Sequence, residues 1–385
     1  MNAAAALIAE RLRGKRIVVT GGTGFIGERL VEQLVHEYAV RPVVLVRSTP
    51  RGRLKRIGAP LEVVKATIAD QAAVSAALKG CNVVMHCAYD SVNRAANLRG
   101  VRNLIEACLS NGARLVHVST FAIYEPFPDI RLTEDAPANR SGSAYSDNKL
   151  EIETEIVEAI RSRGLDAVIL MPTIVYGANG GTWTCGPVRL LLTGTVILPG
   201  AGDGLCNAVH VDDVCQALLL AAVVPTARGR RYFISAVAPV TWRAFFESYA
   251  QIMGCPGPCS ASQITVLSDP EMPRVPTKLN GPLTSPLRMA TRSAPTRRIA
   301  YWTLAHLGDK ANSWIRRLYY RHASPVVHTL DAAFYGAKCH IAIDRITREL
   351  GYAPTYDLER GMAATASWIK DNFRNEIMAI GNRQL

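Results

Sequence analysis

A glycine-rich turn between an apolar run and a helical pattern constrains this chain more than any other feature. The segment Arg16–Glu28 reads RIVVTGGTGFIGE. Its β-branched residues Ile17–Val19 predict a buried strand, and Gly21, Gly24 and Gly27 follow at G-x-x-G-x-x-G spacing. Such glycines allow a tight turn, close approach of a pyrophosphate and tight packing of the next helix. We therefore expect a dinucleotide phosphate at the N-terminus of that helix.

Strand-like runs recur along the chain with helical stretches between them. They are Ile17–Thr20, Val43–Val46, Leu61–Val64, Val83–His86, Leu115–Ser119, Ala167–Met171 and Tyr232–Ser235. Most are continuous apolar runs, as strands covered on both faces should be. Strand alternating with helix predicts an α/β fold, a Rossmann-type doubly wound parallel sheet with a smaller C-terminal substrate lobe. We expect Asp70 to cap a helix over Gln71–Leu78.

The length of 385 residues suits two lobes. We expect a cofactor-binding domain over residues 1–177, to which 205–235 returns, and a substrate lobe from 178–204 and 236–385. The Pro-rich stretch Pro256–Pro295 predicts loops near that boundary. The aromatic residues of this lobe fit a core better than ligand contacts; they are Trp183, Trp242, Phe245 and Phe246.

Composition narrows the class of protein. No apolar run approaches the ~18–20 residues of a membrane span, and the Ala-rich start predicts a short helix in place of a signal peptide. The nine cysteines are scattered, without zinc-finger spacing, so we expect buried or free thiols in a reducing cytoplasm.

The net charge of +12 is unevenly distributed. Residues 281–330 hold eight basic side chains and one acid, Asp309. Nucleic acid is one interpretation of this charge, but no nucleic-acid-binding motif accompanies it, and anionic substrates, cofactor phosphates or a membrane surface fit as well. Within this region, Arg297–His322 mixes arginines with Trp, Tyr and Leu, as interfacial membrane helices do. A substrate lid or dimer helix with solvated arginines is the other interpretation.

The residues after the second strand indicate the cofactor type. Arg47 ends that strand, and Arg51 and Arg53 follow, with no acid before Glu62. An acid here would bind the ribose 2′-hydroxyl of NAD, whereas an arginine suits the 2′-phosphate of NADP. We therefore predict NADP, with NAD as the alternative.

Tyr145 and Lys149 form the candidate catalytic pair. They lie four residues apart at the start of a helical pattern over 143–163, so they share one helix face. A phenol has a pKa of ~10, and a neighbouring ammonium favours the phenolate. We therefore expect Lys149 to lower the pKa of Tyr145, giving a general acid/base. Thr120, at the end of a preceding strand, has a hydroxyl that can bond the same substrate oxygen.

These motifs resemble those of the extended short-chain dehydrogenases/reductases, the NAD-dependent epimerase/dehydratase family. The matching segments cover most of the chain: TGGTGFIG at 20–27, HCA at 86–88, NLRGVRN at 97–103, STFAIY at 119–124, Y-x-x-x-K at 145–149, PTIVYG at 172–177, HVDD at 210–213, and RELGYAPTYDLERGM at 348–362 followed by Trp368.

The resemblance implies a triad of Thr120, Tyr145 and Lys149, no metal, and a homodimer. It also implies cofactor contacts at Gly21, Gly24, Phe25, Ile26, Gly27, Arg47, Thr67, Ile68, Ala88, Tyr145, Lys149 and Pro172. Thr67 stands where the family places an acid on the adenine, so we expect that contact to be altered.

Departures from the family pattern bear on the substrate. Phe121 and Ala122 replace the Asp-Glu pair of sugar-nucleotide dehydratases, which argues against elimination of water. Ile174 and Cys206 replace the Asn and Arg with which hexose 4-epimerases hold a nucleotide diphosphate. The loop at Pro172 is closer to the reductase and hydroxysteroid-dehydrogenase branches.

Three functions follow, and the first is favoured. An oxidoreductase would pass a hydride between the nicotinamide and a secondary alcohol or ketone carbon. A nucleotide-sugar epimerase would use the same triad without net redox change. A cofactor-sensing scaffold would not need the Tyr/Lys pair. We expect a small-molecule substrate and a cytoplasmic enzyme, with peripheral contact at the inner face of a membrane if the basic segment binds lipid.

Overall fold

The computed structural model describes residues 3–47, 54, 57, 61–260 and 326–381, which form two compact units. Unit 1 consists of Met1–Gly180, Asn207–Pro239 and Lys338–Leu358. Unit 2 consists of Gly181–Cys206, Val240–Ala337 and Glu359–Leu385. The basic segment 297–322, Arg51, Arg53 and most of the Pro-rich stretch lie outside the described residues.

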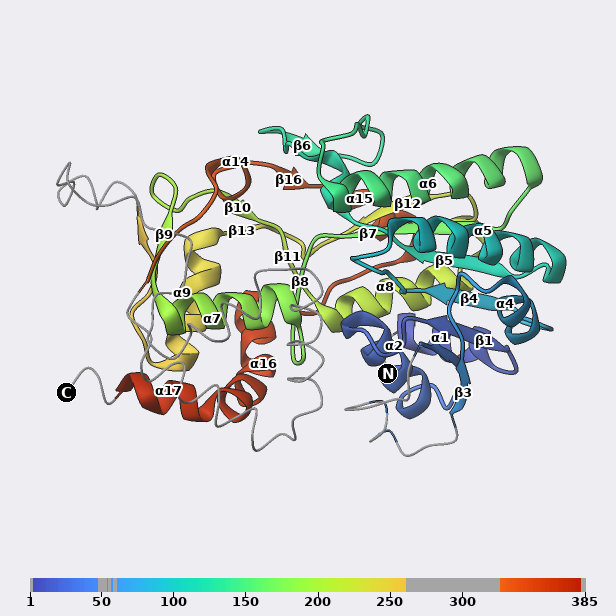
Figure 1. Ribbon diagram of the computed structural model, residues 1–385, viewed down its shortest axis with the longest axis horizontal. Helices are drawn as coiled ribbons and strands as arrows, with labels where there is room; N and C mark the ends of the chain where they lie inside the picture. The colour runs from blue at the N-terminus through green and yellow to red at the C-terminus, as the bar shows by residue number, and fades with distance from the viewer. Residues whose placement is uncertain (1–2, 48–53, 55–56, 58–60, 261–325, 382–385) are drawn as a thin grey trace, which may run out of the picture. The chain divides into compact units, whose positions relative to one another are not determined.

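In the part of unit 1 that is described, seven parallel strands form one sheet in the order β12-β7-β5-β4-β1-β2-β3 (Figure 1). The strands are β1 (Ile17–Thr20), β2 (Val43–Val46), β3 (Glu62–Lys65), β4 (Val83–His86), β5 (Arg114–Val118), β7 (Ala167–Pro172) and β12 (Arg231–Ile234). Strand order reverses between β1 and β4. In open α/β sheets, ligands bind at the carboxyl ends of the strands at such a reversal.

The predicted fold class is confirmed, and each predicted strand is found to within one residue at each end. Residues of β1, β2, β4 and β7 are all buried, as strands covered by helices on both faces require. The third strand differs because β3 is the edge of the sheet, and Val63 is 40% exposed there.

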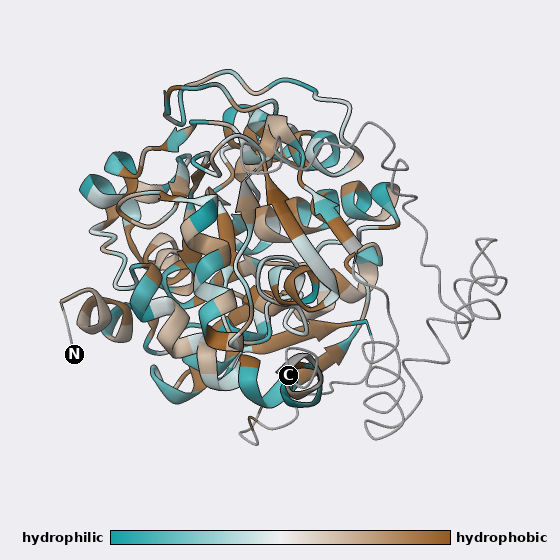
Figure 2. Ribbon diagram, turned by 90° about the vertical axis from the view of Figure 1, so that its left-hand side faces the viewer, coloured by the Kyte–Doolittle hydropathy of each residue, from teal (hydrophilic) through white to brown (hydrophobic). Residues whose placement is uncertain are grey.

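Helices cover both faces of this sheet (Figure 1). α1 (Ala3–Leu12), α2 (Phe25–His36) and α8 (Val211–Val223) lie on one face. α4 (Gln71–Ala77), α5 (Arg94–Asn111) and α6 (Ala144–Arg163) lie on the other, and Ala73 N donates to the Asp70 carboxylate over 3.1 Å as the predicted cap. The strands are mostly brown in Figure 2, whereas helices carry both brown and teal residues, the pattern of one-sided burial.

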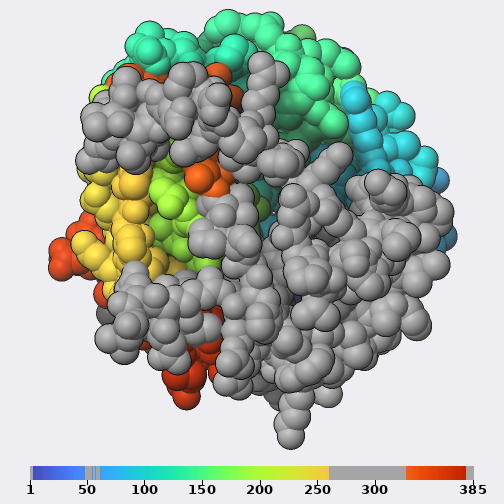
Figure 3. Space-filling model, turned by 60° about the vertical axis from the view of Figure 1, so that its left-hand side comes forward, coloured from blue at the N-terminus to red at the C-terminus, as the bar shows by residue number. Residues whose placement is uncertain are grey.

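Ion pairs join the neighbouring helices α5 and α6 along their outer edges. Arg102 of α5 forms an ion pair with Glu155 of α6 at 2.5 Å. At other turns of the two helices, ion pairs join Arg94 to Glu151 and Glu106 to Arg163. In the space-filling view, the green atoms at the upper right belong to the part of the chain that includes α6 (Figure 3). These pairs fix the position of the helix that carries Tyr145.

Residues 338–358 belong to unit 1, which differs from the expected division of the chain. β16 (His340–Ile341) pairs with β6 (Arg131–Leu132), and α15 (Asp344–Leu350) packs beside β12 and α8. Ile346, Leu350 and Tyr352 join the hydrophobic core of the unit. Burial of these side chains explains why the segment returns to the sheet.

Smaller elements complete unit 1. The ladder of β8 (Ile174–Tyr176) and β11 (Ala208–His210) is parallel. Single turns of 3-10 helix occur at Phe121–Tyr124 and Pro225–Ala227.

Unit 2 has a three-stranded sheet and a cluster of aromatic residues in its described part. Its elements are a π-helical turn (Gly181–Cys185), α7 (Gly186–Thr193), β9 (Gly194–Leu198), β10 (Leu205–Cys206), β13 (Val240–Thr241), α9 (Trp242–Met253), β14 (Cys259–Ser260), β15 (Val326–Thr329), α14 (Ala332–Tyr335), α16 (Leu358–Asn372) and α17 (Arg374–Gly381). Trp242, Phe245 and Phe246 are buried core residues, while Trp183 is half-buried and stacks on Phe334.

No helix among the described residues is long and apolar enough to cross a membrane. None of the nine cysteines, all of which lie among the described residues, forms a disulfide.

Candidate active site

The glycine turn after β1 is packed so tightly that larger residues do not fit. Gly21 has a φ of +73°, and a Cβ added there would lie 2.5 Å from Ala88 N. A Cβ on Gly27 would lie 2.4 Å from the Gly21 carbonyl oxygen. Gly24 N donates to the same oxygen over 2.9 Å. At Gly21 and Gly27 the turn therefore accepts only residues without a side chain.

This turn fits the pyrophosphate of a dinucleotide. Gly24 is the N-cap of α2 and supplies no side-chain hydrogen bond. The first N–H groups of a helix have no intrahelical acceptor, and with the helix dipole they favour an anion. Gly24, Phe25, Ile26 and Gly27 would hold the phosphates there.

The other predicted cofactor residues border the same edge of the sheet. Ile68 follows β3, and a Cβ on Gly100 would lie 2.4 Å from Ile68 Cδ1, so α5 packs closely on this loop. Thr67 Oγ1 accepts a hydrogen bond from Ala69 N over 3.3 Å. Pro172 ends β7. Ala88 follows β4 and lies against the Gly21 turn.

Arg47, the predicted phosphate-binding residue, forms an ion pair with Asp90. Arg47 follows β2 and Asp90 follows β4, so the pair spans the strand β1 that lies between them. The Asp90 carboxylate also accepts hydrogen bonds from Val92 N at 2.9 Å and Asn93 N at 3.1 Å. These backbone donors, and then Arg47, hold the pKa of Asp90 below its ordinary value. A 2′-phosphate would compete with Asp90 for Arg47.

Thr120 lies close enough to Tyr145 for its hydroxyl to affect the pKa of the phenol. Thr120 follows β5, and its Oγ1 accepts from Ala122 N over 3.2 Å, which begins the next turn of helix. Tyr145 lies in the first turn of α6. The Thr120 hydroxyl favours the phenolate, but desolvation is the larger effect, so the net pKa of Tyr145 is raised even though the residue is 43% exposed.

The expectation that Lys149 lowers this pKa is wrong in this structure. The Lys149 ammonium is directed elsewhere: Nζ donates to the Val118 carbonyl over 2.9 Å and lies 4.7 Å from the centre of the Tyr89 ring. Lys149 is 5% exposed, and this burial lowers its own pKa to about 8, although the charge of Glu153 opposes the shift.

Glu153 is a buried carboxylate that sequence reasoning did not single out. It lies one turn beyond Lys149 on α6 and accepts a hydrogen bond from the Ser119 hydroxyl. It also pairs with Arg231 of β12 at 2.9 Å. Its spacing of four residues from Lys149 is the signal in the sequence, because it places the carboxylate on the same helix face.

Two buried histidines lie on the neighbouring strands β4 and β5. His86 Nδ1 is 2.8 Å from Thr20 Oγ1, and its ring centre is 5.0 Å from that of His117 on the next strand. Burial, and then the charge of Lys149, lowers the pKa of His86 to about 3. Both ring nitrogens of His117 lack a hydrogen-bond partner among the described residues. These imidazoles are neutral at physiological pH and do not act as acids.

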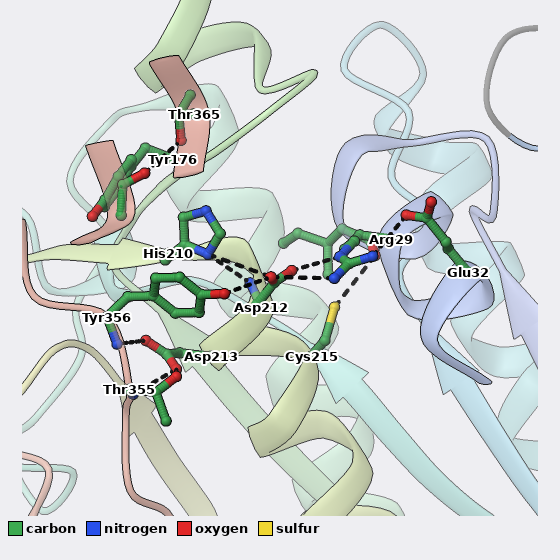
Figure 4. A network of polar contacts seen from close by, with 12 residues as sticks. Arg29, Glu32, Tyr176, His210, Asp212, Asp213, Cys215, Thr355, Tyr356 and Thr365 are labelled. Atoms are coloured by element: carbon green, nitrogen blue, oxygen red, sulfur yellow. Dashed lines mark hydrogen bonds and ion pairs between the residues drawn. The ribbon is translucent and has the colours of Figure 1, made fainter. Parts of the chain in front are cut away.

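The H-V-D-D segment has a structural part in unit 1 (Figure 4). The Asp213 carboxylate accepts hydrogen bonds from Thr355 N at 2.8 Å and Tyr356 N at 3.1 Å. Asp212 pairs with Arg29 of α2 at 2.5 Å. The segment therefore binds the returning chain at 355–356 to α8 and α2.

The chain is similar in sequence to enzymes of one family. Residues 17–234 match the model of the NAD dependent epimerase/dehydratase family. A 4-hydroxy-2-methyl-3-oxo-4-farnesyl-3,4-dihydroquinoline-1-oxide ketoreductase of Stigmatella aurantiaca is 26% identical over 91% of this chain and 95% of its own length. A dTDP-glucose 4,6-dehydratase of Mycobacterium tuberculosis is 32% identical, over 57% of this chain and 72% of that protein.

Solved structures agree on the fold. The crystal structure of a dTDP-glucose 4,6-dehydratase from Streptomyces venezuelae, with NAD bound, aligns with a TM-score of 0.67 and 22% identity over 93% of this chain and 98% of that one. The match of a family model to more than half of the chain, and the glycine turn that this model includes, lead to one conclusion. The chain is an enzyme of the NAD dependent epimerase/dehydratase family, an extended short-chain dehydrogenase/reductase that uses a nicotinamide cofactor.

Proposed function

We propose that this enzyme is an NADP-dependent ketone reductase with Tyr145 as its proton donor. The proposal rests on the nearness of Thr120, which follows β5, to Tyr145, in the first turn of α6: the Thr120 hydroxyl is close enough to lower the pKa of the phenol. The glycine turn lies at the same edge, after β1. A carbonyl oxygen placed between the two hydroxyls would receive two hydrogen bonds.

The proton that reduction requires is available on Tyr145. Its raised pKa leaves the phenol protonated at neutral pH, which is the form that a general acid requires. The nicotinamide, when bound, supplies the hydride to the carbonyl carbon. Tyr145 gives its proton to the carbonyl oxygen as negative charge develops there, and Thr120 stabilises that charge by a hydrogen bond.

The positions that serve dehydratases are apolar here. Phe121 and Ala122 are buried, and the Phe121 ring stacks on Phe127 with centres 4.8 Å apart. These side chains cannot relay a proton for the loss of water. Ile174 and Cys206 are 1% and 0% exposed, so they support the fold and make no polar contact with a nucleotide diphosphate. Both observations disfavour a sugar nucleotide as substrate.

The substrate we propose is an apolar ketone with a long hydrocarbon group. The relative that spans most of this chain is named for reducing a ketone that bears a farnesyl group. The half-buried Phe127 ring, which stacks on the buried Phe121 next to Thr120, suits such a substrate better than a sugar. Arg47 supports NADP as the coenzyme, because it is the cation that follows β2 and its partner Asp90 is exchangeable for a phosphate.

Isotope transfer tests the proposal directly. Protein would be incubated with a long-chain 3-oxo ester and NADPH deuterated at nicotinamide C4 and, separately, with UDP-glucose and the oxidised coenzymes NAD+ and NADP+. We expect one NADPH oxidised per ketone reduced, with deuterium at the new carbinol carbon. The Tyr145→Phe variant serves as the control for background reduction. Conversion of UDP-glucose without net consumption of coenzyme would instead identify an epimerase and overturn the proposal.

A further inference from the structure

Tyr89 lies beside the candidate triad, in a loop that hydrogen bonds hold in place. The loop follows β4, where Cys87 N donates to the Thr20 carbonyl over 3.1 Å. At its other end, Asp90 N donates to Asn97 Oδ1 and the Asn97 amide returns a bond to the Asp90 carbonyl, each over 2.9 Å. The backbone of Tyr89 is therefore fixed from both sides.

Asn97 ties this loop to the catalytic helix. It is 4% exposed, and its Nδ2 also donates to Asn148 Oδ1 over 3.0 Å. Asn148 is the residue before Lys149 on α6. The loop, α5 and α6 thus share one buried set of hydrogen bonds, so the Tyr89 side chain has a defined position relative to α6.

The Tyr89 ring contacts both members of the Y-x-x-x-K pair. Its face lies 4.7 Å from Lys149 Nζ, within the ~6 Å at which a cation is attracted by an aromatic ring. Its centre lies 5.2 Å from that of the Tyr145 ring, and the two planes are at 88°, an edge-to-face contact. The Tyr89 ring therefore contacts both Tyr145 and Lys149, which lie one turn apart on α6.

We propose that Tyr89 is a positioning residue of the active site, whose ring face keeps the buried Lys149 side chain charged and oriented while its contact with the Tyr145 ring fixes the proton donor. This proposal rests on the proposed function only where it uses the rate of ketone reduction; the titration of Lys149 does not depend on that function.

Electrostatics gives the reason that such a ring is needed. Lys149 is almost fully buried, and its Nζ donates to the Val118 carbonyl and lies over the Tyr89 ring face. Cys87, His86 and His117 are also close enough to interact with its charge. Glu153, the acid one turn away on α6, favours the charged form but is already paired with Arg231. Removal of the ring face leaves the ammonium with less stabilisation and makes loss of its proton easier.

Two substitutions of Tyr89 distinguish the effect of its aromatic face from the effect of its apolar bulk. Tyr89→Phe keeps the aromatic face, whereas Tyr89→Leu keeps apolar bulk and removes it. Tyr38→Leu, at a half-buried tyrosine elsewhere in unit 1, controls for general loss of a ring. Melting curves verify that each variant is folded before comparison.

The first measurement is the titration of Lys149 by NMR of protein labelled at lysine Cε. The Lys149→Met variant assigns the resonance. We expect the wild type, Tyr89→Phe and Tyr38→Leu to titrate together, and Tyr89→Leu to titrate at lower pH. Identical titration in Tyr89→Leu and the wild type would overturn the proposal.

The second measurement is the pH profile of kcat for ketone reduction. Lys149 is an expected cofactor contact, so loss of its charge should slow the reaction. In Tyr89→Leu we therefore expect the alkaline fall in rate to begin at lower pH, with kcat reduced by about two- to fifteen-fold at pH 8, since Lys149 of the wild type is already half neutral there. Tyr89→Phe should restore the wild-type profile. A shifted titration in a protein that reduces no ketone would refute the proposed function alone. Equal profiles in Phe and Leu variants would refute the role of the ring.

Discussion

Glu153 and Arg231 form a buried ion pair at 2.9 Å that joins the catalytic helix α6 to the strand β12. The Glu153 side chain is 3% exposed and that of Arg231 26%. The same carboxylate accepts a hydrogen bond from Ser119, the residue before Thr120. One carboxylate thus fixes the strand end that carries Thr120 and the helix that carries Tyr145.

We expect Glu153→Ala to destabilise the protein by up to about 3 kcal/mol, because it leaves the half-buried Arg231 guanidinium without its counter-charge. Glu153→Gln keeps the hydrogen bond from Ser119 and should cost less. Urea unfolding measures both. Glu158→Gln, at an exposed position of the same helix, is the matched control and should change stability by less than about 0.5 kcal/mol. Equal stability of Glu153→Ala and the control would contradict the role assigned to the pair.

Lys149 gives stability a pH dependence whose sign follows from its pKa. The folded value of about 8 is below the ordinary 10.5, so folding disfavours the ammonium. This penalty, up to about 3 kcal/mol at ~1.4 kcal/mol per unit, is complete below pH 8 and disappears as the pH rises to 10.5. Lys149→Met should therefore have a larger free energy of unfolding than the wild type at pH 7. Loss of the hydrogen bond to the Val118 carbonyl offsets part of this gain.

The difference in unfolding free energy between this variant and the wild type should shrink between pH 8 and pH 10.5. Lys79→Met, at an exposed lysine, should show no such trend. A constant difference across that range would mean that Lys149 is not forced toward its neutral form.

Tyr145→Phe should lower kcat for the true substrate by ~10²–10⁴-fold, the usual contribution of a general acid. The phenylalanine ring keeps the edge contact with Tyr89, so the fold and the affinity for NADPH should stay the same. Steady-state rates and coenzyme titrations check both parts. Turnover at the wild-type rate would remove Tyr145 from the mechanism.

Arg47 and Asp90 make a prediction about coenzyme choice. Arg47→Asp should shift preference from NADPH toward NADH, because it exchanges a phosphate partner for an acceptor of ribose hydroxyls. Asp90→Asn should strengthen NADPH binding by up to about five-fold, since an exposed ion pair that holds Arg47 is worth at most ~1 kcal/mol. NADH affinity should not change in Asp90→Asn. Tighter binding of NADH than of NADPH by the wild type would show that Arg47 has been misinterpreted.

The sequence predicted those features that local physics determines. Gly21 and Gly27 were identified because only a residue without a Cβ fits there, and the structure shows why. Buried strands were found from continuous apolar runs. The strand at residues 62–65 looked similar in sequence, but its exposure depends on its place at the edge of the sheet, which no local pattern encodes.

Side-chain direction was the harder part of the site. The spacing of Tyr145 and Lys149 correctly placed both on one helix face, yet it could not show that the ammonium lies against Val118 and Tyr89. That geometry depends on a loop from β4, far away in the sequence. For the same reason, Tyr89 and Arg231 were not recognised as neighbours of the catalytic helix.

The three-segment construction of unit 1 has a consequence during synthesis on the ribosome. Glu153 is translated long before Arg231, by roughly 4–16 seconds at the usual ~5–20 residues per second. Until β12 emerges, the carboxylate behind the catalytic helix has no guanidinium to meet, and the edge of β7 that β12 later covers is open. The nascent chain therefore carries Thr120, Tyr145 and Lys149 for some time before the contact that locks them together can form.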